Sequence, residues 1–187
     1  MSNPATDGSG AVADLLACRT LLSAFPSVLT GIITHLPTRA LSLSDGPGRW
    51  TPQQVLAHLL QIEEASWIPR IDHLLRGLDG PLPLVQPDRH LDRYASRDTH
   101  ELLEAFSFQR QASLQAWDAR QVGVEDWRRC ARHPEAGTVT LGNIIGTWAM
   151  HDLDHLVQIL AVVGHDGQRL VGPLARYLRI CRGTRHV

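Results

Sequence analysis

The chain has 187 residues and a formal charge of −1 at pH 7, a length that fits one domain whose core folds without disulfides. Because it has no basic run, neither nucleic acid nor an anionic membrane surface is an expected partner. All 18 basic side chains are arginine, which excludes Schiff-base chemistry on lysine.

Cysteine usage and the N-terminus indicate the compartment. Cys18, Cys130 and Cys181 lie far apart and form no CxxC motif, so neither a disulfide framework nor a cysteine zinc site is predicted. Residues 1–10 are small and polar, which is typical of a disordered tail and not of a signal peptide. No apolar run approaches the ~20 residues of a membrane span. We therefore expect a cytoplasmic protein with a single domain at residues 11–187.

The first predicted helix covers residues 11–35. Pro26 is expected to kink or interrupt it, because proline removes a backbone donor and crowds the preceding turn. Residues 38–49, which contain the run Asp-Gly-Pro-Gly, predict a connection.

The second predicted helix has the clearest start signal in the chain. Thr51 is a good N-cap, a proline follows it, and Gln54 completes a capping box. The helix is predicted to run to Arg76 and to end at Gly77, with a bend at Pro69.

This second helix is predicted to be apolar on two sides. At about 100° per residue, His58 faces inward with Val55 and Ile62. The opposite stripe predicts a dimer contact, or alternatively a surface on which the following loop docks. It consists of Leu56, Leu60, Trp67, Ile71 and Leu74.

A long connection precedes the third predicted helix. Residues 78–97 are rich in proline and charge and lack a helical period. A segment of this length can return the chain along the whole bundle, so that the second and third helices run parallel. The third helix is predicted to begin at Asp98, with Glu101 completing another capping box, and to continue to Ala119.

Arg110 lies in the middle of the apolar stripe of the third helix. A buried guanidinium does not lose its proton, so it requires an anion. One interpretation is a salt bridge within the bundle, or a side chain that reaches solvent. The other is an anchor for a substrate carboxylate, which would make Arg110 a candidate catalytic residue.

The last long helix is predicted over residues 140–163, ending at Gly164, after a connection at residues 120–139. A short helix near residues 173–181 is predicted to pack across one end of the bundle. The elements together predict an all-α helical bundle with a short C-terminal helix, and the second and third helices run parallel if the long connection is a crossover.

Three histidines are candidate metal ligands. His151 and His155 are one helical turn apart inside an apolar stripe, so both imidazoles can point at one spot, and His58 is a third inward histidine. The alternative is that they are core histidines bonded to backbone or to one another, because H-x-x-x-H alone is weak evidence. The other seven are expected to be solvated. They are His35, His73, His90, His100, His133, His165 and His186.

The acidic residues near these histidines offer no predicted general base. Glu63 and Glu64 point away from the direction of His58, and Asp152 and Asp154 are expected to be solvated. A dedicated proton acceptor is therefore not expected beside the metal ligands.

Two sequence blocks resemble the DinB-like superfamily. The run Trp-Thr-Pro-Gln-Gln-Val-Leu-Ala-His-Leu at 50–59 precedes Thr-Leu-Gly-Asn-Ile-Ile at 140–145 and His-Asp-Leu-Asp-His-Leu-Val-Gln-Ile at 151–159. The resemblance covers roughly residues 11–164 and includes an arginine at the place of Arg110. It implies a four-helix bundle, homodimers in many members, and a divalent metal, commonly zinc or nickel, on the histidines matching His58, His151 and His155.

Relatives in this superfamily include transferases that use low-molecular-weight thiols. The resemblance therefore implies a thiol S-transferase that acts on a small-molecule thiol and an electrophile. Arg110 would be the anion anchor and Trp148 a wall of the cofactor pocket, with core packing as the alternative for Trp148. The alternative functions are a non-catalytic metal-binding stress-response dimer, whose site a fourth ligand such as His35 would close, and a metal-dependent hydrolase.

Overall fold

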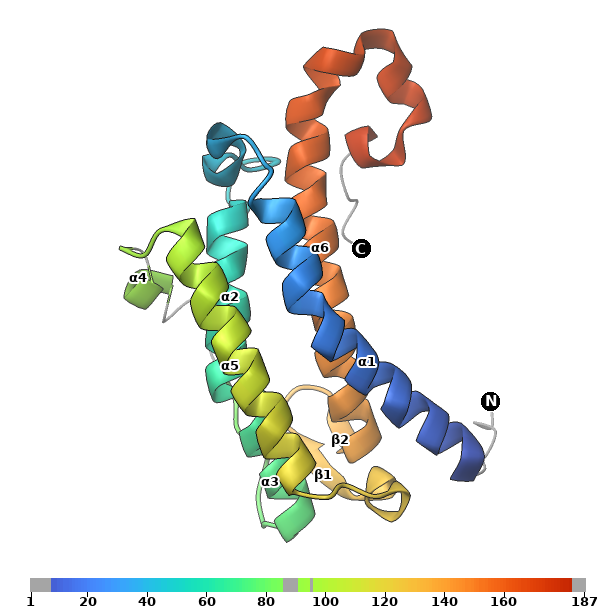
Figure 1. The fold of residues 1–187 in the computed structure, drawn as a ribbon. Helices are drawn as coiled ribbons and strands as arrows, with labels where there is room; N and C mark the ends of the chain where they lie inside the picture. The colour runs from blue at the N-terminus through green and yellow to red at the C-terminus, as the bar shows by residue number, and fades with distance from the viewer. Residues whose placement is uncertain (1–7, 86–90, 95, 183–187) are drawn as a thin grey trace.

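The computed structural model describes residues 8–85, 91–94 and 96–182 of the chain, and most of them are helical (Figure 1). The predicted four-helix bundle is confirmed. Its long helices are α1 (Gly8–Ile33), α2 (Pro52–Ala65), α5 (Thr99–Ala119) and α6 (Leu141–Val171). The shorter elements are α3 (Trp67–Arg76), α4 (Leu91–Tyr94), β1 (Cys130–His133) and β2 (Gly137–Thr140).

The direction of the helices follows the prediction. Figure 1 shows α2 and α5 running in one direction, and α1 and α6 running in the other. The segment from α3 to α5 therefore returns along the bundle, as the crossover at residues 78–97 predicts. It includes α4, while residues 86–90 and 95 lie outside the described part of the chain.

Capping boxes begin three of the long helices. At the start of α2, the Thr51 side chain accepts a hydrogen bond from the backbone N–H of Gln54, whose side chain accepts one from the Thr51 N–H. The box at Asp98 has the same two bonds, as predicted. A third box, at Thr140, begins α6. Each helix start is therefore fixed by neighbours in the sequence.

The second predicted helix is two helices. It breaks at Ser66, whose φ of −108° and ψ of −59° separate α2 from α3. Pro69 does not bend a continuous helix, because it lies in the first turn of α3, where a missing N–H removes no helical hydrogen bond. Gly77 ends α3 in the left-handed conformation with a φ of 60°, as predicted.

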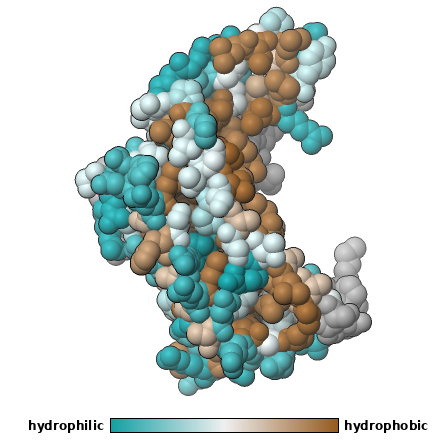
Figure 2. Space-filling model, in the orientation of Figure 1, coloured by the Kyte–Doolittle hydropathy of each residue, from teal (hydrophilic) through white to brown (hydrophobic). Residues whose placement is uncertain are grey.

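The predicted dimer face is wrong, because its residues are buried within one chain. Leu60, Trp67, Ile71 and Leu74 are each at most 3% exposed. The exposed large apolar side chains lie elsewhere, including the C-terminal segments at the top of Figure 2. Homodimer formation stays a prediction, without the face that suggested it.

Several boundaries differ from the predicted ones. α1 begins at Gly8, inside the predicted tail at residues 1–10, and continues through Pro26 without interruption. The connection at residues 120–139 contains a 3-10 turn and the antiparallel hairpin of β1 and β2, which no periodicity indicated. The C-terminal helix is replaced by two 3-10 segments at Gly172–Tyr177 and Arg179–Arg182.

α1 is more apolar than its sequence pattern suggested. Gly10–Ile33 is long and apolar enough, by length and composition, to cross a membrane, although Asp14 and Arg19 interrupt its apolar residues. The core helix of a globular bundle satisfies the same criterion. Leu22 and Leu29 of this segment are fully buried between the other helices, so core packing accounts for part of its apolar character.

α6 does not end at Gly164 but continues to Val171. Gly164 lies against the backbone of Ile180, where a methyl group would collide with the carbonyl oxygen. The glycine therefore permits close approach of the C-terminal segment instead of ending the helix.

We expect Gly164→Ala to lower the free energy of unfolding by about 1–3 kcal/mol, since the backbone of Ile180 must shift to admit the methyl group. The matched control is Gly146→Ala in the same helix, where no atom lies within 4 Å of an added methyl group. That variant should gain about 0.4–1 kcal/mol, since alanine is the better helix former. Urea unfolding measures both, and stabilisation of both variants would contradict the packing argument.

Candidate metal centre

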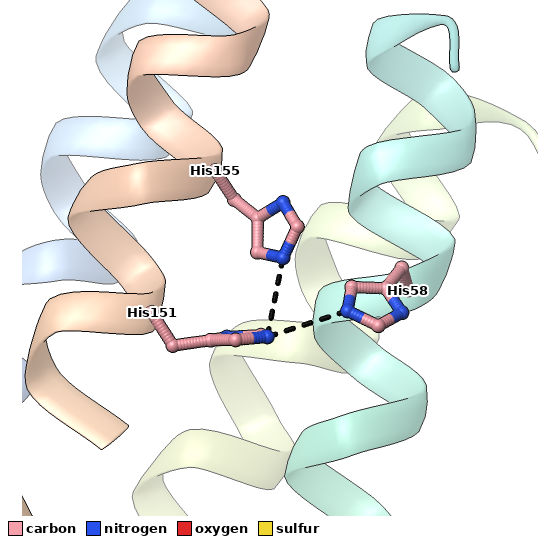
Figure 3. Close-up of side chains that lie close together, drawn as sticks. All are labelled: His58, His151 and His155. Carbon is pink, nitrogen blue, oxygen red and sulfur yellow. Dashed lines mark hydrogen bonds between the residues drawn. The ribbon is translucent and has the colours of Figure 1, made fainter. Parts of the chain in front are cut away.

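Two helices bring the three candidate histidines together. His58 projects from the second turn of α2, and His151 and His155 project from one face of α6, a single turn apart (Figure 3). The helices are adjacent in the bundle, and all three rings point into the space between them. The structure thus gathers residues that are 93 positions apart in the sequence.

The spacing of the ring nitrogens fits one metal ion. Nε2 of His151 lies 3.3 Å from Nε2 of His58 and 3.1 Å from Nε2 of His155. Imidazole nitrogens bound to one tetrahedral zinc ion at ~2.0–2.1 Å are separated by roughly 3.3–3.4 Å. One proton cannot satisfy three converging nitrogens, whereas a shared cation can. The ligand atoms of all three histidines lie within 4.8 Å of one another, so the donor set can hold one divalent ion.

Burial keeps the three imidazoles in the form that binds metal. Desolvation, with the adjacent His155, lowers the pKa of His58 to about 3. Desolvation and the neighbouring histidines lower the pKa of His151 to about 2, and desolvation also lowers that of His155. At neutral pH all three rings are therefore uncharged, with lone pairs available for coordination.

Among the described residues, the side chain of Gln158 fixes the tautomer of one candidate metal ligand, His155. Nδ1 of His155 lies 2.9 Å from Oε1 of Gln158, so the ring donates Nδ1–H to the amide oxygen and leaves Nε2 free to bind a cation. Nδ1 of His58 and Nδ1 of His151 are buried without a hydrogen-bond partner among the described residues. Gln158 is therefore a supporting residue for the site.

Two tryptophans that the sequence analysis did not nominate pack against the histidines. The Trp50 ring lies 4.8 Å from that of His58 and stacks on His155 at 6.3 Å. The Trp67 ring meets that of His151 edge-on at 5.4 Å. Trp50 packs on one of the two apolar core clusters and Trp67 belongs to the other, so the site lies where these clusters meet.

The sequence contained a partial indication of the positions of Trp50 and Trp67 beside the histidines. Trp50 immediately precedes the cap of α2, about two turns from His58, which favours a contact between their side chains. A straight helix places Trp67 on the side opposite His58, and the break at Ser66 is what redirects it. Pro69, which was predicted to bend one continuous helix, could have indicated that break, because proline is favoured in the first turn of a new helix.

Arg110 forms a buried ion-pair network inside the bundle. Its guanidinium donates to both oxygens of Asp152 at 2.6 and 2.9 Å, to Glu63 at 2.9 Å and to the carbonyl of Leu22 at 3.1 Å. The indole N–H of Trp148 donates to the same oxygen of Glu63 at 3.0 Å. Burial favours the neutral form of Arg110, but the two carboxylates outweigh it and raise the pKa.

This network corrects three predictions. Arg110 is 1% exposed and already paired with two carboxylates, so it is not available as an anion anchor, and the salt-bridge interpretation applies. Trp148 is fully buried and stacks behind Trp67, so it packs the core and does not line the site. Asp152 is 2% exposed, not solvated, and burial raises its pKa to about 6 against the pull of Arg110.

Most of the remaining histidines lie away from the cluster, as expected. His35 bonds to the carbonyl of Gly31, His100 and His165 are exposed, and His133 is half-buried in the hairpin. His73 is an exception to their predicted solvation, since it is 7% exposed. His90 and His186 lie outside the described residues. Within the described part of the chain, no fourth histidine, cysteine or carboxylate joins the three ligands.

The fold and the cluster together define a class of protein, a four-helix bundle with parallel middle helices and a three-histidine site that can hold a divalent metal. A family model described as the DinB superfamily matches residues 21–159. The match covers well over half of the chain, and the chain therefore belongs to the DinB superfamily.

Two similar proteins have names that mention metal. A protein of Oceanobacillus iheyensis, named as a presumed metal-dependent hydrolase, is 25% identical over 146 residues, which cover 73% of this chain and 78% of the relative. The structure of YfiT from Bacillus subtilis, described as a probable metal-dependent hydrolase with an unusual four-helix bundle topology, matches with a TM-score of 0.68. The sequence of YfiT is 16% identical to this chain, and the match covers 91% of this chain and 93% of YfiT. At this identity the match shows the likeness of the fold.

Proposed function

We propose that the chain is a metal-dependent transferase that joins a low-molecular-weight thiol to an electrophile. The observation that carries this proposal is a three-imidazole site without a fourth protein ligand among the described residues. A divalent ion, with zinc and nickel as the best candidates, would lower the pKa of a thiol that takes the remaining ligand position.

The surroundings of the histidines suit this reaction. Neutral imidazoles leave the charge of the ion available to a thiolate, and Trp50 and Trp67 limit the access of water to the rings. The new S–C bond forms as the leaving group departs from the carbon with its electron pair, and the thiol proton passes to solvent. No side chain has to protonate the leaving group when it departs as a stable anion.

A metal-dependent hydrolase is the second candidate, and the names of the two relatives favour it. Hydrolysis of an amide needs a proton donor for the leaving amine. Two nearby carboxylates, Glu63 and Asp152, are held by Arg110, and Asp154 is exposed in an open pocket that His151 also lines. The absence of a free buried acid among the described residues beside the cluster supports thiol transfer over amide hydrolysis.

The test compares both reactions on one preparation of the full chain loaded with zinc or nickel. We expect conjugation of cysteine with chlorodinitrobenzene that a chelator abolishes and that His58→Ala lacks. The exposed His100→Ala variant is the matched control and should retain activity. Chelator-sensitive cleavage of nitrophenyl acetate without thiol conjugation would overturn the proposal in favour of a hydrolase, and neither reaction would favour a non-catalytic metal-binding protein.

We also propose a reducing cytoplasmic location for this chemistry. Cys18, Cys130 and Cys181 are all unpaired, as expected where disulfides do not persist. The proposal predicts that all three thiols react with a thiol reagent in denatured protein prepared without reductant.

A further inference from the structure

Arg70 places a positive charge close to the histidine cluster. It lies on α3, one turn after Trp67, and its guanidinium carbon is 6.0 Å from the centroid of the Trp67 ring. The same ring is 5.4 Å from the ring of His151. The guanidinium carbon of Arg70 and the centre of the His151 ring are therefore separated by no more than the sum of these two distances.

This charge has no anionic partner among the described residues. Nε of Arg70 donates to the carbonyl oxygen of Pro83 at 3.1 Å, and no described carboxylate forms an ion pair with the guanidinium. By contrast, Arg110 and Arg120 are each matched by carboxylates on neighbouring helices.

Arg70 is also partly withdrawn from water. Its side chain is half-buried, and desolvation lowers its pKa. A half-buried cation without a protein anion is a place where a bound anion is favoured, because the anion offsets the lost hydration.

We propose that Arg70 binds a carboxylate of the thiol substrate, so that the site selects thiol acids over neutral thiols. The inference rests on the proposed thiol transfer. The Pro83 carbonyl occupies Nε, which leaves the two terminal nitrogens of the guanidinium to hold both oxygens of a carboxylate. The sulfur would point to the histidines while Arg70 holds the acid, and Arg70 thereby takes the role that the sequence suggested for Arg110.

The test measures binding to the zinc-loaded full chain by calorimetry, without the electrophile. The probes are 3-mercaptopropionate and its neutral amide, which differ in the charge opposite Arg70. Charge-assisted hydrogen bonds at a half-buried arginine should give the acid about tenfold tighter binding than the amide. Arg70→Gln should abolish that preference by weakening the acid alone, while the zinc content stays at the wild-type level.

Arg76→Gln is the matched control, because it removes one charge from the exposed last turn of the same helix and should keep the preference. If Arg70→Gln fails to fold, Arg70→Lys carries the test, since it retains the charge but not the planar pair of donors and should lose part of the preference. Equal binding of the two thiols by the wild-type chain, or an undiminished preference in the Arg70 variant, overturns the inference. A preference for the acid without any conjugation would instead refute thiol transfer and leave the anion site standing.

Discussion

His58→Ala is expected to abolish stoichiometric metal binding. The wild-type chain, purified without a histidine tag, should hold about one divalent ion, because three neutral Nε2 atoms converge from α2 and α6. Loss of an outer-shell partner of a ligand costs about 10–100-fold in metal affinity, and the loss of a ligand should exceed about 100-fold. Elemental analysis gives the stoichiometry, and titration against a competing chelator gives the affinity.

His100→Ala is the control for this prediction. The His100 side chain is 74% exposed and pairs at most with Glu104, so its loss should leave the metal content unchanged. Equal metal in the wild type and in His58→Ala would show that the three imidazoles do not form the site. The protein would then be an all-helical scaffold with buried core histidines.

Arg110→Met is expected to cause the largest loss of stability of the substitutions considered. It leaves the carboxylates of Glu63 and Asp152 buried without their cation, and breaking a buried pair of this kind costs about 3–5 kcal/mol. The midpoint of urea unfolding, followed by circular dichroism, should fall accordingly.

Two comparisons separate this effect from simple loss of an arginine. Arg19→Ala removes an ion pair with Asp118 whose side chains are 31% and 58% exposed, and it should cost less than about 1 kcal/mol. Replacing all three charged groups, as Arg110→Met with Glu63→Gln and Asp152→Asn, should recover much of the stability because no charge is left uncompensated. A cost below about 1 kcal/mol for Arg110→Met alone would contradict the buried network.

The observed pairing of Arg110 and the proposed role of Arg70 differ because the two guanidinium groups have different neighbours. Both arginines belong to helices of the bundle and both carry a fixed charge. Arg110 meets two carboxylates and serves the core, whereas Arg70 meets a backbone carbonyl and lies beside an aromatic wall of the site. The neighbours of each guanidinium therefore make Arg110 a structural cation and Arg70 a candidate substrate contact.

The sequence by itself determined the features that neighbouring residues encode. The capping boxes at Thr51 and Asp98 set the starts of α2 and α5, and the four-residue spacing of His151 and His155 set both rings on one face of α6. These features could be predicted because each depends on atoms within one or two helical turns. The crossover between α3 and α5 was consistent with parallel helices because a segment of its length can span the bundle.

Only the tertiary structure decided which groups meet across the bundle. Arg110 is 42 residues from Asp152 and 47 from Glu63, and periodicity places each on a face of a helix without naming its partner. The break at Ser66 redirected the part of the supposed outer stripe that follows it and brought Trp67 to His151. Local sequence sets where a side chain lies on its own helix. The packing of helices that are distant in the sequence sets what that side chain touches, and the chemistry of the site depends on these contacts.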